Sequence, residues 1–147
     1  MNESISIAGL VKVVHTDKDG ALISEFSQPN LVTTVGKVQI AQLIENVVAV
    51  TAPSHMAVGS SNTAPSVANT TLGTELARVA LTSTTQSTNT VVYVATFGPG
   101  VGTGTLEEGG LFNAGAAGTM TCRTLFSASV PKAAGDTVEI TWTVTVG

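Results

Sequence analysis

The chain has 147 residues, of which only 11% are charged, against roughly a quarter in ordinary soluble domains. This length fits one domain with a substantial core, so we predict a single domain over residues 1–147. The formal charge of −4 and the dispersed basic residues exclude a polyanion-binding surface, and we expect no nucleic-acid partner. A surface so poor in charge is predicted to meet other protein over much of its area.

Neither a membrane-spanning segment nor a secretory leader is expected. The apolar run Val47–Val50 stops at Thr51, far short of the roughly 20 apolar residues that a spanning helix needs. The first residues carry Glu3 and no basic cluster, which is not typical of a signal peptide. We therefore expect synthesis in the cytoplasm and no membrane partner.

The first 30 residues are predicted to form a β-hairpin or an arm used in assembly. Residues 4–14 alternate well enough for a strand, and residues 21–26 can return against it. Between them, Asp17–Gly20 supplies the Asp-Gly pair of a tight turn. Asp17 and Asp19 also resemble the start of a calcium loop, but no Glu stands at the twelfth position, so turn chemistry is the better interpretation.

One short helix is predicted from about Thr34 to Glu45. Thr33 or Thr34 can cap its N-terminus. Its apolar residues recur at helical spacing on one side: Val35, Val38, Ala41 and Ile44. Because the helix is short and amphipathic, we expect this side to pack on a sheet.

The middle of the chain predicts strands over residues 55–59 and 89–97, with a helical turn leading into a strand over residues 71–81. The strand 89–97 is apolar on both faces at its centre, which favours a place inside the sandwich or at a subunit contact. The glycine-rich residues 98–104 predict a mobile exposed loop, because no Lys-Ser or Lys-Thr pair follows them as in a phosphate-binding loop. Residues 107–110 predict another turn.

Two strands are predicted near the C-terminus. Residues 119–130 alternate with Cys122 on the apolar face, which predicts a buried, inert thiol, and a single cysteine excludes an internal disulfide. In residues 137–146 every second side chain is apolar, and Thr141, Thr143 and Thr145 lie on the opposite face. About seven strands and one helix predict an all-β fold, a β-sandwich or jelly-roll-like domain.

No catalytic, cofactor or metal site is predicted, and we expect no enzymatic activity. His15 and His55 lie in unrelated contexts without a local nucleophile or carboxylate signature, so each is interpreted as a structural or surface histidine. A lone cysteine also excludes a zinc site built on several cysteines.

Four charged residues suggest ion pairs. Glu75 and Arg78 would face one another on a helical turn, and Arg123, on the outward face of its strand, could pair with Glu108. These are either fixed pairs inside or between subunits or screened surface pairs, and the sequence supports both interpretations equally.

The second half of the chain carries a set of short motifs. They are Gly59–Ser66, then Leu72, Glu75 and Arg78, then Glu108–Asn113, then Gly118–Met120 with Arg123–Thr124 and Phe126–Ser127, and finally Ile140–Val144. This set, over roughly residues 55–147, resembles small structural proteins of tailed-bacteriophage virions, with Gly109 where that group has Ala. The resemblance implies a virion component, in the head or in the tail.

The leading hypothesis is therefore a capsid decoration (cement) protein that forms a homotrimer, binds the outside of the mature head through the major capsid protein and bridges capsomers. The alternatives are a tail-tube or tail-fibre module and a virion-surface glycan-binding domain. The glycan interpretation is disfavoured because aromatic residues are only 4% of the chain and Trp142 faces the predicted core.

Intersubunit contact is expected from residues 1–14 and 137–146, by pairing with the edge of a neighbour's sheet. Deleting residues 1–14 is expected to abolish shell binding and to leave a folded core. The candidate assembly residues are Ile5, Ile7, Leu10, Val11, Glu75, Arg78, Glu108, Arg123, Thr141, Thr143 and Thr145.

Overall fold

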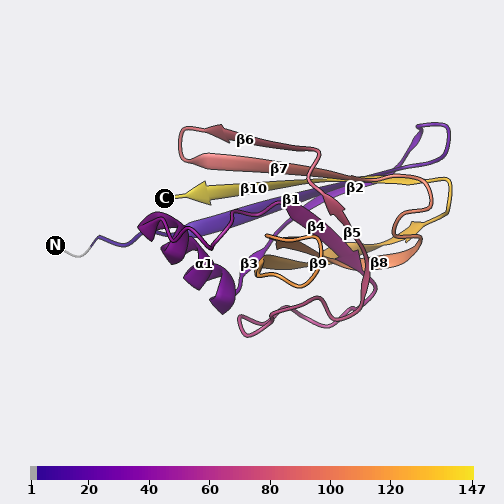
Figure 1. The fold of residues 1–147 in the computed structure, drawn as a ribbon. Coiled ribbons are helices and arrows are strands. Elements are labelled where there is room, and N and C mark those ends of the chain that lie inside the picture. The colour runs from indigo at the N-terminus through magenta and orange to yellow at the C-terminus, as the bar shows by residue number, and fades with distance from the viewer. Residues whose placement is uncertain (1–2) are drawn as a thin grey trace.

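The computed structural model describes residues 3–147 as a sandwich of two five-stranded antiparallel sheets with one helix (Figure 1). Sheet A has the order β2 (Leu22–Pro29), β1 (Ile7–Thr16), β10 (Thr137–Val146), β7 (Thr90–Phe97) and β6 (Ser83–Ser87). Sheet B has the order β3 (Leu31–Val32), β9 (Met120–Lys132), β8 (Gly104–Phe112), β4 (His55–Gly59) and β5 (Glu75–Ala80). With the helix α1 (Thr34–Glu45), this confirms the predicted all-β fold with one short helix.

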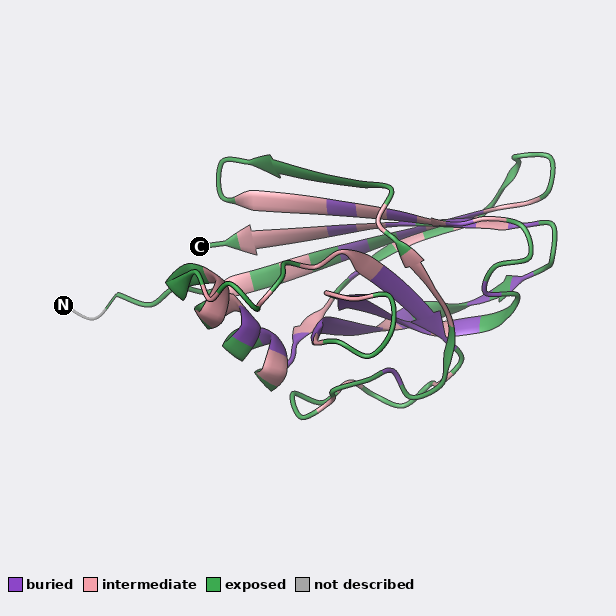
Figure 2. Cartoon of the chain, viewed as in Figure 1, coloured by how far each residue is buried: buried purple, intermediate pink, exposed green. Residues whose placement is uncertain are grey.

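The core lies between the two sheets, and the buried residues, purple in Figure 2, lie on strands of both sheets. Val11 and Val13 of β1 and Ile140 and Trp142 of β10 are completely buried. The indole of Trp142 keeps a hydrogen bond inside the core, because its Nε1 donates to Asn30 Oδ1 at 3.1 Å. The faultless alternation of residues 137–146 is thus explained by one face that packs in the core.

The first and last strands are interior strands of sheet A. β1 pairs with β10 from Ile7↔Val146 to Thr16↔Thr137, and each has a second neighbour, β2 or β7. The expectation that these segments offer free edges to a neighbouring subunit is therefore wrong. Deleting residues 1–14 would remove a central strand and could not leave a folded core; only residues 1–6 precede β1.

The β1–β2 hairpin and its turn are as predicted. The carboxylate of Asp17 accepts hydrogen bonds from the backbone amides of Asp19 and Ala21, at 2.9 and 2.8 Å. Gly20 has a φ of +83°, which explains the glycine at this position. The hairpin does not project as an arm, because β1 continues into sheet A through its pairs with β10.

Helix α1 packs on β9 through a different side from the one predicted. Val38, Ala41 and Ile44 are exposed, whereas Gly36 and Gln39 are buried. A side chain at Gly36 would collide with the carbonyl of Thr121, so glycine permits the close approach. The helix has a second apolar side, formed by the half-buried Val35, Ile40 and Leu43, and polar bonds near Gly36 and Gln39 select that side.

Those polar bonds fix the start of the helix to β9. Thr33 caps α1 by accepting from the amide of Gly36 at 2.9 Å, and its hydroxyl donates to the carbonyl of Met120 at 2.6 Å. The hydroxyl of Thr121 donates to Gln39 Oε1 at 2.5 Å. Buried polar groups need such partners, so this pattern outweighs the apolar spacing of the other side.

Three further local predictions are wrong. Residues 107–110, expected as a turn, lie within β8, where Gly110 has no room for a side chain beside Phe112 and Leu72. Residues 71–74 form no helical turn before β5. The loop after β7 is not wholly exposed, since Gly102 is buried. Strand β6, polar throughout, gave no periodic signal and was not predicted.

Candidate assembly site

Glu108 of β8 and Arg123 of β9 form an ion pair in the interior. Arg123 donates from Nε and Nη2 to Glu108 Oε2, at 3.0 and 2.8 Å, and both side chains are almost completely buried. Arg123 lies on the outward face of β9, as predicted, since its neighbour Cys122 faces the core, but the segment 60–74 covers it. The alternatives left open for this pair are resolved in favour of a fixed pair within the chain.

The same two side chains fasten the segment 60–74, which has no strand or helix of its own. The Glu108 carboxylate accepts from the backbone amides of Ser61, Gly73 and Thr74, at 3.3, 3.0 and 2.8 Å. The guanidinium of Arg123 donates to the backbone carbonyls of Thr63 and Ala64 and to the side-chain oxygen Oδ1 of Asn69. Because these partners lie along the whole segment, the pair holds the segment against sheet B.

Glu75 and Arg78 form a second, partly buried pair on β5. The guanidinium donates to both carboxylate oxygens, at 3.0 and 2.7 Å, and stacks 3.6 Å from the centre of the Phe112 ring. The register with β4 shifts between Val58 and Gly59, so β5 carries one additional residue and Glu75 can reach Arg78. Pairing is as expected, but on a bulged strand and not on a helical turn.

Arg78 also binds the segment between β8 and β9. Its Nη1 donates to the carbonyls of Ala114 and Ala117, at 3.0 and 2.8 Å. Its side chain is only 8% exposed. Glu75, Arg78, Glu108 and Arg123 are therefore occupied within the chain, and their predicted role in contact with another subunit has no support from their geometry.

A third polar cluster lies at one end of sheet A, where it joins the end of β1 to the residue before β10. His15 Nε2 lies 2.8 Å from Asp136 Oδ2, and the same oxygen accepts from the amide of Ala133 at 2.9 Å. The hydrogen bond from His15, followed by that from Ala133, lowers the pKa of Asp136. Lys132 donates to the carbonyl of Gly98 at 2.9 Å, and burial lowers the pKa of Lys132.

These groups do not assemble into a recognisable catalytic arrangement. Within residues 3–147, no hydroxyl or thiol hydrogen-bonds to His15. His55 Nδ1 lies 2.9 Å from Ser54 Oγ, but neither residue is bonded to a carboxylate in the described part of the chain. In that same part, no three His, Cys, Asp or Glu side chains are grouped as metal ligands.

Cys122 is buried, as predicted. Desolvation by burial raises the pKa of its thiol to about 12. A thiolate is the reactive form of cysteine, so this residue is inert in the folded protein.

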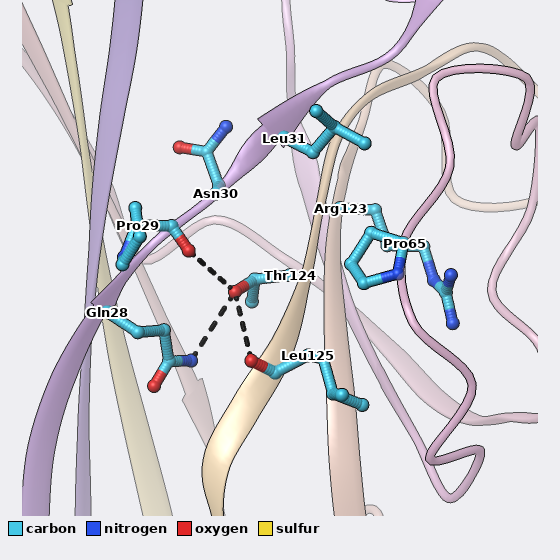
Figure 3. A pocket seen from close by; sticks show the side chains of 8 residues that line it. All are labelled: Gln28, Pro29, Asn30, Leu31, Pro65, Arg123, Thr124 and Leu125. Atoms are coloured by element: carbon cyan, nitrogen blue, oxygen red, sulfur yellow. Dashed lines mark hydrogen bonds between the residues drawn. The ribbon is translucent and has the colours of Figure 1, made fainter.

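The cavity between β2, β3 and β9 has a volume of about 340 Å³ (Figure 3). Two of its polar side chains are engaged: Thr124 Oγ1 donates to the carbonyl of Pro29 at 3.0 Å, and Arg123 is bound to Glu108. Asn30 accepts from Trp142, but its buried Nδ2 has no hydrogen-bond partner among the described residues. The rest of its wall is formed largely by Leu31, Pro65 and Leu125. No free charged group is available here to orient a ligand.

The remaining assembly candidates differ in accessibility. Ile5 is 77% and Leu10 51% exposed, whereas Ile7 is half-buried against the core. Val11 is completely buried, so its proposed role in assembly is wrong. On the outer face of sheet A, three threonines of β10 are half-buried between β1 and β7: Thr141, Thr143 and Thr145.

A surface that the sequence did not reveal lies where the termini meet α1. Residues 3–6 run beside the C-terminus, and Ser6 and Gly147 exchange backbone hydrogen bonds at 2.5 and 3.0 Å (Figure 1). We define the arm–helix end by its exposed apolar side chains: Ile5, Val38, Ile44, Val48 and Val146. Ile44 and Val48, at 80% and 95% exposure, are among the most exposed large apolar residues of the described chain.

Two long stretches of the chain carry no charge, whereas the arm and helix α1 carry the exposed Glu3, Lys37 and Glu45. Residues 46–74 and 79–106 contain no Asp, Glu, Lys or Arg. Interfaces between proteins are depleted of charge at their centres, so such a surface is suited to contact with protein. The sequence did contain a signal for this surface. Helix α1 has apolar residues on two sides, and only one side can pack on β9, so the other side is left exposed.

No helix in residues 3–147 combines the length and apolar character needed to cross a membrane. Comparisons of the chain with protein-family models, with curated proteins and with solved structures found no match.

Proposed function

We propose that this chain is a head decoration protein of a tailed bacteriophage, which associates with itself and binds the outer surface of the mature capsid. The observation that carries the proposal is the arm–helix end, where five large apolar side chains are exposed. Charged residues outside this end, notably Glu108 and Arg123, pair with each other within the chain and are not available to a partner.

The motifs that resemble phage virion proteins support the proposal from a second direction. Several of them meet in the cluster that fastens residues 60–74: Ser61, Thr63, Glu108 and Arg123. In this view the shared motifs preserve a scaffold, and the surface that selects the partner lies elsewhere. The arm and α1 belong to the first 54 residues, which the resemblance does not cover.

A decoration protein stabilises a shell because it binds the mature form and not the open one. Burying exposed apolar area contributes about 25 cal/mol per Å², but association has a large entropic cost, so one arm–helix end alone would bind weakly. A homotrimer, as in the leading hypothesis, would present three such ends and gain affinity through avidity. Bridging of neighbouring capsomers then follows from the spacing of the copies.

Location is the first test. Gold-labelled antibodies against the chain should mark the heads of intact particles from the source lysate. Labels confined to tails would overturn head decoration and favour the alternative tail-tube or tail-fibre module. Particles without label would remove the chain from the virion altogether.

Binding is the second test, and the structure dictates the variant. Deleting residues 1–5 removes Ile5 but keeps Ser6 and all of β1, so the thermal unfolding temperature should stay unchanged. Binding to purified shells that lack the protein should weaken about tenfold or more, as expected for loss of a buried isoleucine contact. Val101→Ser, at an exposed apolar position outside the arm–helix end, is the control and should bind normally.

The glycan-binding alternative has no supporting observation. Glycan sites use exposed aromatic side chains, but Trp142 is completely buried, Tyr93 is buried and Phe26 is only partly accessible.

A further inference from the structure

The two sheets have four edge strands, and three of them are protected against pairing with another chain. β2 carries Glu25 and ends at Pro29. β3 is only two residues long. β5 is bulged and carries the Glu75–Arg78 pair. Short length, charge, proline and bulges are the usual means by which proteins block such edges.

The fourth edge, β6, has none of these features. Its five residues, Ser83–Ser87, are all exposed and include no charged residue and no proline. Its register with β7 is unbroken from Ser83↔Val94 to Ser87↔Thr90. A regular exposed edge leaves backbone amides and carbonyls open to another strand.

The neighbourhood of β6 is also free of charge. Neither β6 nor β7 carries a charged side chain; on the outer face of sheet A the nearest is Glu139 of β10, opposite Thr96 at the far end of β7. This matters for pairing between identical strands, because a twofold axis places each strand against its own copy and would bring like charges together.

We propose that β6 pairs antiparallel with β6 of a second copy, about a twofold axis at Thr85, and joins the two A sheets into one ten-stranded sheet. Thr85 would then lie opposite Thr85 of the second copy, and Ser83 opposite Ser87. Cross-strand threonine pairs are favourable. The inference goes beyond the proposed function, since it does not depend on where the protein resides, and the twofold contact is separate from any threefold one.

The expected affinity is modest. A five-residue edge buries well below the roughly 800 Å² per partner of a standard interface. The dimer should therefore dissociate in the micromolar range or weaker, and its detection requires protein concentrations up to several hundred micromolar.

The test is sedimentation velocity of the full chain over that concentration range. Thr85→Glu should weaken self-association about tenfold or more, because two carboxylates would lie directly opposite one another. Ser27→Glu is the matched control: it places the same charge on an exposed position of the other edge strand of sheet A and should leave association unchanged. Circular dichroism and thermal unfolding verify that both variants are folded.

A rescue experiment makes the assignment specific to the pair. Thr85→Lys alone should also weaken association, whereas an equimolar mixture of Thr85→Glu and Thr85→Lys should restore a dimer of one copy of each. A wild-type chain that is monomeric throughout, an association that Thr85→Glu leaves intact, or a mixture that stays dissociated would overturn the proposal.

Discussion

The segment 60–74 and the arm–helix end differ in what their side chains contact. The segment 60–74 is polar, yet Glu108 and Arg123 bind it to sheet B, and its own Leu72 is buried. The arm–helix end is apolar, yet Ile44 and Val48 face solvent. Here charged side chains such as Glu108 and Arg123 fix the fold, while apolar side chains are left outside, and this inversion supports the proposed assembly role.

The largest predicted effect concerns the fastened segment. Arg123→Met should lower the free energy of unfolding by about 3–5 kcal/mol, because it leaves the buried Glu108 carboxylate without its charge partner. Urea denaturation at pH 7 measures the change. Lys18→Ala, which breaks the exposed pair with Asp19, is the control and should change stability by less than about 1 kcal/mol. Equal effects of the two substitutions would contradict the role of the buried pair.

The second prediction concerns the attachment of α1. Gly36→Ala should lower the free energy of unfolding by about 1–3 kcal/mol, because the added methyl group collides with the carbonyl of Thr121. Alanine is the better helix former by about 1 kcal/mol, so an isolated helix would respond in the opposite sense. Stabilisation by Gly36→Ala, measured by urea denaturation, would show that α1 is not seated closely on β9.

The third prediction sets a pH dependence at the His15–Asp136 contact. The hydrogen bond from His15 lowers the pKa of Asp136 in the folded protein below its ordinary value near 3.8. The contribution of Asp136 is thus present above about pH 4 and is lost as the pH falls through the lowered pKa. Asp136→Asn should flatten this part of the stability profile, measured by urea denaturation between pH 7 and pH 2. Parallel profiles for wild type and variant would contradict the assignment.

The smallest predicted effect on stability lies at the arm–helix end. Ile44→Ser should change the free energy of unfolding by less than about 0.5 kcal/mol, since the side chain is 80% exposed. Ile40→Ser, on the side of α1 that packs against the core, should cost about 1 kcal/mol or more. A large loss from Ile44→Ser would mean that this side chain supports the fold and is not reserved for a partner.

Sequence patterns predicted the strands whose faces differ in polarity. Residues 137–146 alternate because one face is dry, and the structure confirms this at Trp142. The prediction of a turn over residues 107–110 was wrong because two adjacent glycines are typical of turns. Here these glycines make room for packed side chains. The side of α1 that is buried could not be predicted, since the bonds of Thr33 and Thr121 that select it join residues far apart in sequence.

The same limit applied to the candidate site. The pair Glu75–Arg78 was suggested by spacing in the sequence and the pair Glu108–Arg123 by the scarcity of charges, and the structure contains both. Their burial was not foreseeable, because the cover over Arg123 comes from loop residues about 60 positions earlier. The sequence therefore left a buried pair and a screened surface pair as equal alternatives, and only the structure decides between them.

The pairing of β1 with β10 also constrains how the chain folds. His15 and Asp136 lie 121 residues apart, and nearly the whole chain must be made before the centre of sheet A can close. Contacts of such long sequence separation slow folding, because the entropy of closing the loop is lost before the contact forms. During synthesis on the ribosome, the other edge of β1 stays unpaired until β10 has been made, and an unpaired strand edge is open to misassembly.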